Sequence, residues 1–126
     1  MDNKKAGKLL YSELTSKIIE CFYEVYNSLG VGFNREIYEK SLYLELKSKG
    51  LSVIENYGLE IHYRKEKVGE EHVDLLVENK VLLQIYNDKA LDKYKEDRLY
   101  NQLKSSDYEV GMLLNFGKTP ELKRKG

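Results

Sequence analysis

The sequence predicts one mixed α+β domain, in which helices and β-strands follow each other in blocks. Three observations predict it: a helical period of apolar residues near the N-terminus, strand-like alternation after Gly50, and a helical segment followed by one more apolar strand. A chain of 126 residues can bury one hydrophobic core without disulfides. We therefore expect a single domain over residues 1–126, with its core over about 9–117 and flexible lysine-rich ends.

Two helices are predicted at the start of the chain. Over residues 9–29 the apolar side chains recur at steps of three and four, as on one face of a helix, and Gly30 follows as a stop. A second helix is expected over residues 35–49, with Asn34 as its N-cap and Gly50 after its last residue.

The middle of the chain predicts an antiparallel meander. Segments rich in Val, Ile, Leu and Tyr, separated by turn-like residues, cover 51–57, 59–64, 67–78 and 80–86. Residues 92–106 return to helical spacing, and residues 108–117 have the length and apolar content of a buried strand. Pro120 lies beyond this strand. A mixed sheet covered by helices is the architecture that this order predicts.

Composition excludes several classes of protein. Lys and Arg total 21 and Asp and Glu total 21, so no net charge attracts nucleic acid and any such binding needs a local patch. No apolar run could span a bilayer, and no signal-peptide stretch is present, so we expect a cytoplasmic chain. The single cysteine, Cys21, excludes an internal disulfide. The 11 tyrosines favour core or interface contacts over base stacking.

Three segments carry a resemblance to a known family: GVGFNREIYEKSLYLELKSKGL at 30–51, HVDLLVENKVLLQI at 72–85 and YEVGMLLNFG at 108–117. With the order of elements, they resemble the small bacterial GxxExxY family of the PD-(D/E)XK nuclease superfamily, over about 18–117. The resemblance implies a PD-(D/E)XK fold and metal-dependent cleavage of phosphodiesters. In such a site two carboxylates hold Mg²⁺, and a lysine two residues after the second orients the attacking water.

In the strands, the resemblance implies a changed site. The aspartate of the family matches Asp74. Its glutamate position holds Gln84, which has no charge, and its lysine position holds Tyr86, which is neutral at pH 7 because tyrosine titrates near ~10.

The helical motifs also differ from the family. Gly32 and Tyr38 match the glycine and tyrosine of GxxExxY, but the glutamate position holds Arg35. A glutamine that relatives carry on the third helix falls on Arg98. At ~4–8 Å each unit of charge is worth about 2–4 kcal/mol even at an effective dielectric constant of ~20. We therefore expect Asp74 to bind no metal ion, and Arg35 or Arg98 to pair with it.

These substitutions predict a catalytically inactive domain without a cofactor. Its expected role is binding, either of a protein partner or a second copy of itself, or of nucleic acid through Arg35, Arg98 and the lysine-rich ends. Two alternatives stay open. One is a Mg²⁺- or Mn²⁺-dependent endonuclease that uses Asp74 with Glu39, which lies on the helical face of Arg35, as a relocated carboxylate. The other is a purely structural, tyrosine-rich homo-oligomer.

The two histidines, His62 and His72, fall in different predicted strands without the spacing of a metal pair. We expect them to be surface or hairpin residues.

Overall fold

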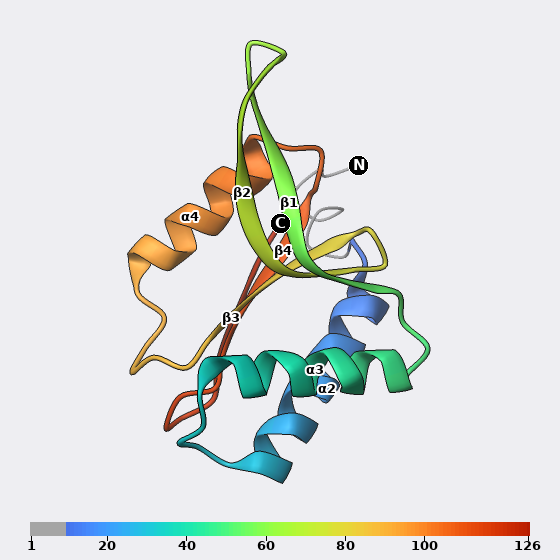
Figure 1. Cartoon of the computed structure of the whole chain (residues 1–126), viewed down its shortest axis with the longest axis vertical. Helices are drawn as coiled ribbons and strands as arrows, with labels where there is room; N and C mark the ends of the chain where they lie inside the picture. The colour runs from blue at the N-terminus through green and yellow to red at the C-terminus, as the bar shows by residue number, and fades with distance from the viewer. Residues whose placement is uncertain (1–9) are drawn as a thin grey trace.

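A computed structural model of the chain describes residues 10–126 (Figure 1). Within them it contains three helices, α2 (Ser12–Leu29), α3 (Arg35–Ser48) and α4 (Lys93–Lys104). It also contains five strands, β1 (Val53–Tyr63), β2 (Glu66–Val77), β3 (Val81–Tyr86), β4 (Val110–Asn115) and β5 (Glu121–Lys125). The predicted α+β class with a mixed sheet is confirmed.

The strands form one sheet in the order β1-β2-β3-β4-β5. The first three make the predicted antiparallel meander, and β3 runs parallel to β4 because α4 carries the chain back across the sheet. The two strand segments expected over 51–57 and 59–64 form a single strand, β1, with a register shift between Ile61 and His62. A bulge of this kind lets a long hairpin twist without breaking its pairing.

Helices cover both faces of the sheet, with α2 and α3 on one face and α4 on the other (Figure 1). The first layer buries Ile18, Phe22, Leu42, Leu83 and Met112, and the second buries Leu59, Leu82, Leu99 and Leu113. Strand β4 is buried along its whole length, as predicted. Gly111 permits α4 to approach it, because a Cβ atom at this position would lie 2.7 Å from Leu99 Cδ1.

The prediction that the chain ends in a flexible, lysine-rich segment is wrong for Glu121–Lys125, which form β5 beside β4. The amino groups of Lys123 and Lys125 lie 2.8 and 3.1 Å from the two carboxylate oxygens of Glu96 on α4. The sequence of this segment shows no apolar alternation. Half-buried charged side chains, rather than apolar ones, hold it at the edge of the sheet. The lysine-rich N-terminal end lies outside the described residues.

Tyr38 holds the connection between α2 and α3. Its buried hydroxyl donates to the Gly30 carbonyl at 2.7 Å and accepts from the Phe33 amide at 3.2 Å. Its ring stacks on Phe116 with centroids 4.7 Å apart. Asn34 is the N-cap of α3, as expected, although its side chain makes no capping hydrogen bond. The tyrosine therefore fixes the start of α3, from which Arg35 extends.

Candidate functional site

The candidate site lies where the sheet divides between β2 and β3. These strands pair only over Leu75–Val77 and Val81–Leu83, and Asp74 is the first β2 residue beyond that ladder. Its buried carboxylate accepts a hydrogen bond from the Ile85 amide, with Oδ2 2.7 Å from the nitrogen. The side chain thus replaces the backbone carbonyl that a continuing ladder would supply.

Arg35 lies against this carboxylate from α3. Its Nη1 atom is 2.8 Å from Glu39 Oε1, 3.3 Å from Asp74 Oδ2 and 3.3 Å from the Ile85 carbonyl oxygen. One guanidinium nitrogen therefore meets three oxygens from α3, β2 and β3. Of the two arginines expected near Asp74, the structure places Arg35 there.

Charge and burial act together in this group, which we call the Arg35–Asp74 cluster (Arg35, Glu39, His72 and Asp74). Burial raises the pKa of Glu39, and the neighbouring Asp74 charge adds to this, while the hydrogen bond from Arg35 opposes it. Burial alone would lower the pKa of Arg35, but the hydrogen bond to Glu39 and the charge of Asp74 raise it overall. The guanidinium therefore stays charged beside two carboxylates.

His72 belongs to the cluster, and the sequence reasoning missed this role. Its side chain is half exposed, as expected for a surface residue, but its Nε2 lies 2.8 Å from Asp74 Oδ1. The available signal was the spacing of two from Asp74, which puts both side chains on one face of β2. His62 lies elsewhere, with Nε2 3.6 Å from Glu60 Oε1.

Gln84 points to the α4 side, where both hydrogens of its buried amide are used. Its Nε2 donates to the His72 carbonyl and to Gln102 Oε1, each at 3.1 Å. Gln102 is also buried, and its own Nε2 donates to Glu71 Oε1 at 3.3 Å. Neither Gln102 nor Glu71 was a predicted site residue, because only the packing of α4 on the sheet brings them to Gln84.

Tyr86 and Arg98 lie near this amide chain rather than at Asp74. The guanidinium of Arg98 contacts Glu71, with Nε 3.4 Å from Oε1. Burial raises the pKa of Tyr86, an effect that the charge of Arg98 and its hydrogen bond to the tyrosine oppose. The phenol is therefore neutral at physiological pH. The Lys95 amino group lies 5.3 Å from the centre of the Tyr86 ring.

We compared the chain with models of known protein families. The chain matches the family model of the PD-(D/E)XK nuclease superfamily over residues 12–125. The chain belongs to this superfamily. Comparisons with curated proteins and with solved structures gave no match.

Within this PD-(D/E)XK domain, the structure brings Arg35, Glu39 and Asp74 into contact and places Gln84 beside them on the opposite face of β3. Tyr38 is a packing residue of the α2–α3 connection. Among residues 10–126, no three His, Cys, Asp or Glu side chains are grouped as a metal-binding set. No helix in the same residues has the length and apolar character of a membrane span.

Proposed function

We propose that this PD-(D/E)XK domain does not cleave nucleic acid and serves as a protein-interaction module. The observation that carries the first half is the position of Arg35 Nη1, within 3.3 Å of Asp74 Oδ2 and of the Ile85 carbonyl and 2.8 Å from Glu39 Oε1. A fixed guanidinium neutralises the acids and is a poor base. It leaves no role for an attacking water.

The side chains present do not suit a divalent cation. Mg²⁺ requires hard oxygen ligands in near-octahedral geometry. Both carboxylate oxygens of Asp74 already have partners, namely His72 at Oδ1 and the Ile85 amide with Arg35 at Oδ2. The amide nitrogen of Gln84 offers hydrogens rather than lone pairs, and its carbonyl oxygen Oε1 accepts a hydrogen bond from the Asp74 amide at 3.4 Å. We derive no catalytic step through a metal ion here.

The finer family assignment belongs to the same proposal. Gly32 and Tyr38 keep two positions of the GxxExxY motif, and Arg35 replaces its glutamate. Gln84 and Tyr86 replace the glutamate and lysine of the strand motif. We infer a GxxExxY-type domain with a degenerate site, in which the tyrosine that organises the fold is kept.

Ion pairing supports a protein partner over nucleic acid. Arg35 and Arg98, expected to contact phosphates, each face a carboxylate, and so do Lys123 and Lys125. Phosphate binding would have to compete with these pairs. Exposed apolar side chains instead lie on the outer face of α3, in the loop before it and at the start of β1. They are Val31, Phe33, Ile37, Leu44 and Ile54.

A second copy of the chain fits this face by charge. Ile37 and Leu44 are seven residues apart and so lie on one side of α3, which also exposes Lys47 and Lys40, the latter paired with Glu55 at 3.1 Å. The neighbouring helix α2 exposes Glu13, Glu20 and Glu24 on one face, together with Lys17, so this face carries a net negative charge. A twofold axis would set α2 of one copy against α3 of the other, so that each basic face meets an acidic one. We propose a homodimer through this α2–α3 layer.

The cleavage half is tested with purified chain and plasmid or short duplex DNA in Mg²⁺ or Mn²⁺. We expect no cleavage, and calorimetry with Mn²⁺ should show no site. Cleavage that EDTA blocks and that Asp74→Ala and Glu39→Gln each abolish would support the alternative, an endonuclease with a relocated carboxylate. Asp97→Asn, at an exposed acid on α4, is the matched control.

The interaction half is tested by size exclusion with light scattering. We expect a dimer at micromolar concentration that Leu44→Glu converts to a monomer, because the variant buries a charge at the centre of the interface. Val68→Glu makes the same kind of change at an exposed site on β2 and should leave the dimer intact. A wild-type monomer at all concentrations, or equal effects of the two variants, would refute the proposed interface.

A further inference from the structure

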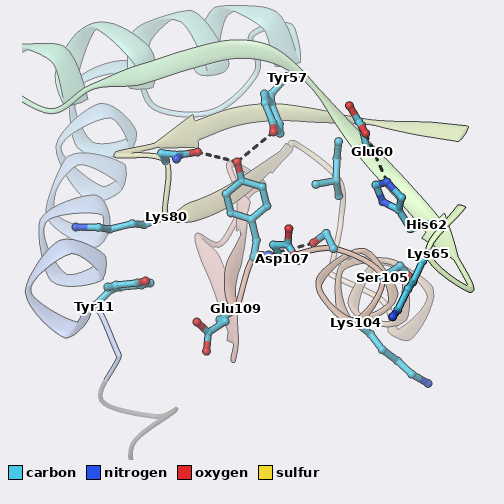
Figure 2. Close-up of a pocket in the computed structure, with 14 residues that line it drawn as sticks. Tyr11, Tyr57, Glu60, His62, Lys65, Lys80, Lys104, Ser105, Asp107 and Glu109 are labelled. Carbon is cyan, nitrogen blue, oxygen red and sulfur yellow. Dashed lines mark hydrogen bonds and ion pairs between the residues drawn. The ribbon is translucent and has the colours of Figure 1, made fainter. Parts of the chain in front are cut away.

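A cavity of about 760 Å³ lies beside the C-terminal end of α4, apart from the Arg35–Asp74 cluster (Figure 2). Its walls are the β1–β2 hairpin, the loop after α4 and the β2–β3 turn. No residue of the cluster lines it. Its volume lies in the range of sites that take small organic ligands. A ligand there would meet a different set of side chains from those of the superfamily site.

An ordered pair of tyrosines forms one wall of this cavity. The Tyr108 hydroxyl donates to Asn79 Oδ1 at 2.7 Å, so its hydrogen is used, and the Tyr57 hydroxyl donates to Tyr108 at 3.1 Å. The rings meet edge to face with centroids 6.0 Å apart. Burial, with the hydrogen bond to Tyr57, raises the pKa of Tyr108 to about 12. The wall is therefore a fixed, neutral aromatic surface.

Two lysines reach the cavity from different elements, Lys65 from the tip of the β1–β2 hairpin and Lys104 from the last turn of α4. Neither contacts a carboxylate among the described residues, whereas Lys67 on the same hairpin lies 2.9 Å from Glu70. Figure 2 shows both lysines toward one end of the cavity, where the Glu60 carboxylate lies 3.6 Å from His62 Nε2 and contacts neither lysine. Like charges lining one end of a cavity are stabilised by a bound anion.

The rest of the lining supplies acceptors. Asp107 and Glu109 line the cavity without a cationic partner in the described part of the chain. In Figure 2 Glu109 lies toward the end opposite Lys65, near Tyr11 and Lys80. Carboxylates accept hydrogen bonds from the amino groups of nucleobases, as they do from the cytosine amino group in DNA. Cations, an aromatic wall and acceptors thus share one cavity.

We propose that this cavity binds a nucleotide unit, with its phosphate between Lys65 and Lys104 and its base against Tyr57 and Tyr108. A base has a π-face that stacks on tyrosine. Guanine suits the acceptors best, because its adjacent imino and amino hydrogens match the two oxygens of a carboxylate. The same chemistry serves a free nucleotide or the phosphorylated 5′ end of a strand. The inference goes beyond the proposed function and does not depend on it.

Calorimetric titration of the full chain with GMP tests the site. Inorganic phosphate and guanosine, the two halves of GMP, are titrated separately for comparison. We expect GMP to bind at least about tenfold more tightly than either half. Lys104→Ala should weaken GMP about tenfold, because a charge-assisted hydrogen bond to phosphate is lost. Lys89→Ala removes an exposed lysine of the β3–α4 loop that is in neither the cavity lining nor the proposed dimer interface, and should change nothing.

Two further arms complete the test. Tyr57→Ala, which removes the ring, should weaken GMP while leaving the weak binding of inorganic phosphate unchanged. Short oligonucleotides with and without a 5′-phosphate separate the two sources: preference for the phosphorylated strand over GMP assigns the site to a strand end, and equal or weaker binding assigns it to the free nucleotide. The proposal would be overturned if neither GMP nor an oligonucleotide binds at millimolar concentration, or if inorganic phosphate binds as tightly as GMP. Equal effects of Lys104→Ala and Lys89→Ala on GMP binding would also overturn it.

Discussion

A single nitrogen atom of Arg35 takes the place at which the carboxylates of the site converge. The Arg35 side chain is partly buried, and a guanidinium that loses water contacts needs acceptor oxygens around it. Glu39, Asp74 and the Ile85 carbonyl supply those acceptors. The arginine and the acids therefore depend on one another, and each would be an uncompensated charge without its partner.

Gln84 lies in a chain of hydrogen bonds that a glutamate at the same position would disrupt. Its Nε2 donates to the His72 carbonyl and to Gln102 Oε1. In Gln84→Glu both acceptors would face a carboxylate oxygen, so we expect the free energy of unfolding at pH 7 to fall by about 1–3 kcal/mol. Chemical denaturation measures this loss.

The deficit of Gln84→Glu should shrink on acidification. A buried glutamate that faces acceptors has a pKa raised above its unfolded value, so its folded state binds a proton more tightly. Stability relative to wild type is therefore recovered as the pH falls through that raised pKa and lost as the pH rises. Asn101→Asp makes the same amide-to-acid change at an exposed position of α4 and should show no such trend. A stable, pH-independent Gln84→Glu protein would contradict the assigned role of this amide.

At the scale of elements, the sequence predicted the helices and strands whose apolar residues recur with a regular period. Both N-terminal helices, the meander and the buried strand at Val110–Asn115 follow from apolar spacing, and the observed ends differ from the predicted ones by a few residues. Strand β5 was missed because ELKRK has no apolar alternation, and its place depends on Glu96 of α4. A partner that lies 27 residues away leaves no local signal.

The same limit applies to the site. Matching positions to a family identified Arg35, Asp74, Gln84 and their neighbours, and the charge argument paired an arginine with Asp74. It did not choose between Arg35 and Arg98, since that choice depends on which helix packs beside the end of the β2–β3 ladder. Glu71 and Gln102 entered only through the packing of α4 on the sheet. The sequence therefore predicted the helices and strands themselves. It did not predict the side-chain contacts between them.

For the whole molecule, the formal net charge of zero comes from 21 basic and 21 acidic side chains. Many of these side chains form local ion pairs. One of them ties the end of the chain to its middle: Lys123 and Lys125 on β5 hold Glu96 on α4. Their hydrogen bonds lower the pKa of Glu96. A carboxylate with a lowered folded pKa stabilises the fold above its unfolded pKa, and this contribution is lost as the pH falls through the folded value.

Glu96→Gln should therefore lower the melting temperature at neutral pH by a few degrees or less, because these partly exposed ion pairs are screened by solvent. The difference from wild type should vanish on titration to below the folded pKa of Glu96, and it should narrow in high salt at pH 7. Glu66→Gln, at an exposed position of β2, makes the same change outside this ion pair and outside the proposed dimer interface, and should have no effect at any pH. If Glu96→Gln and Glu66→Gln melt alike at pH 7 in low salt, β5 is held by its backbone pairing with β4, and the ion pairs of Glu96 add nothing to the stability of the fold.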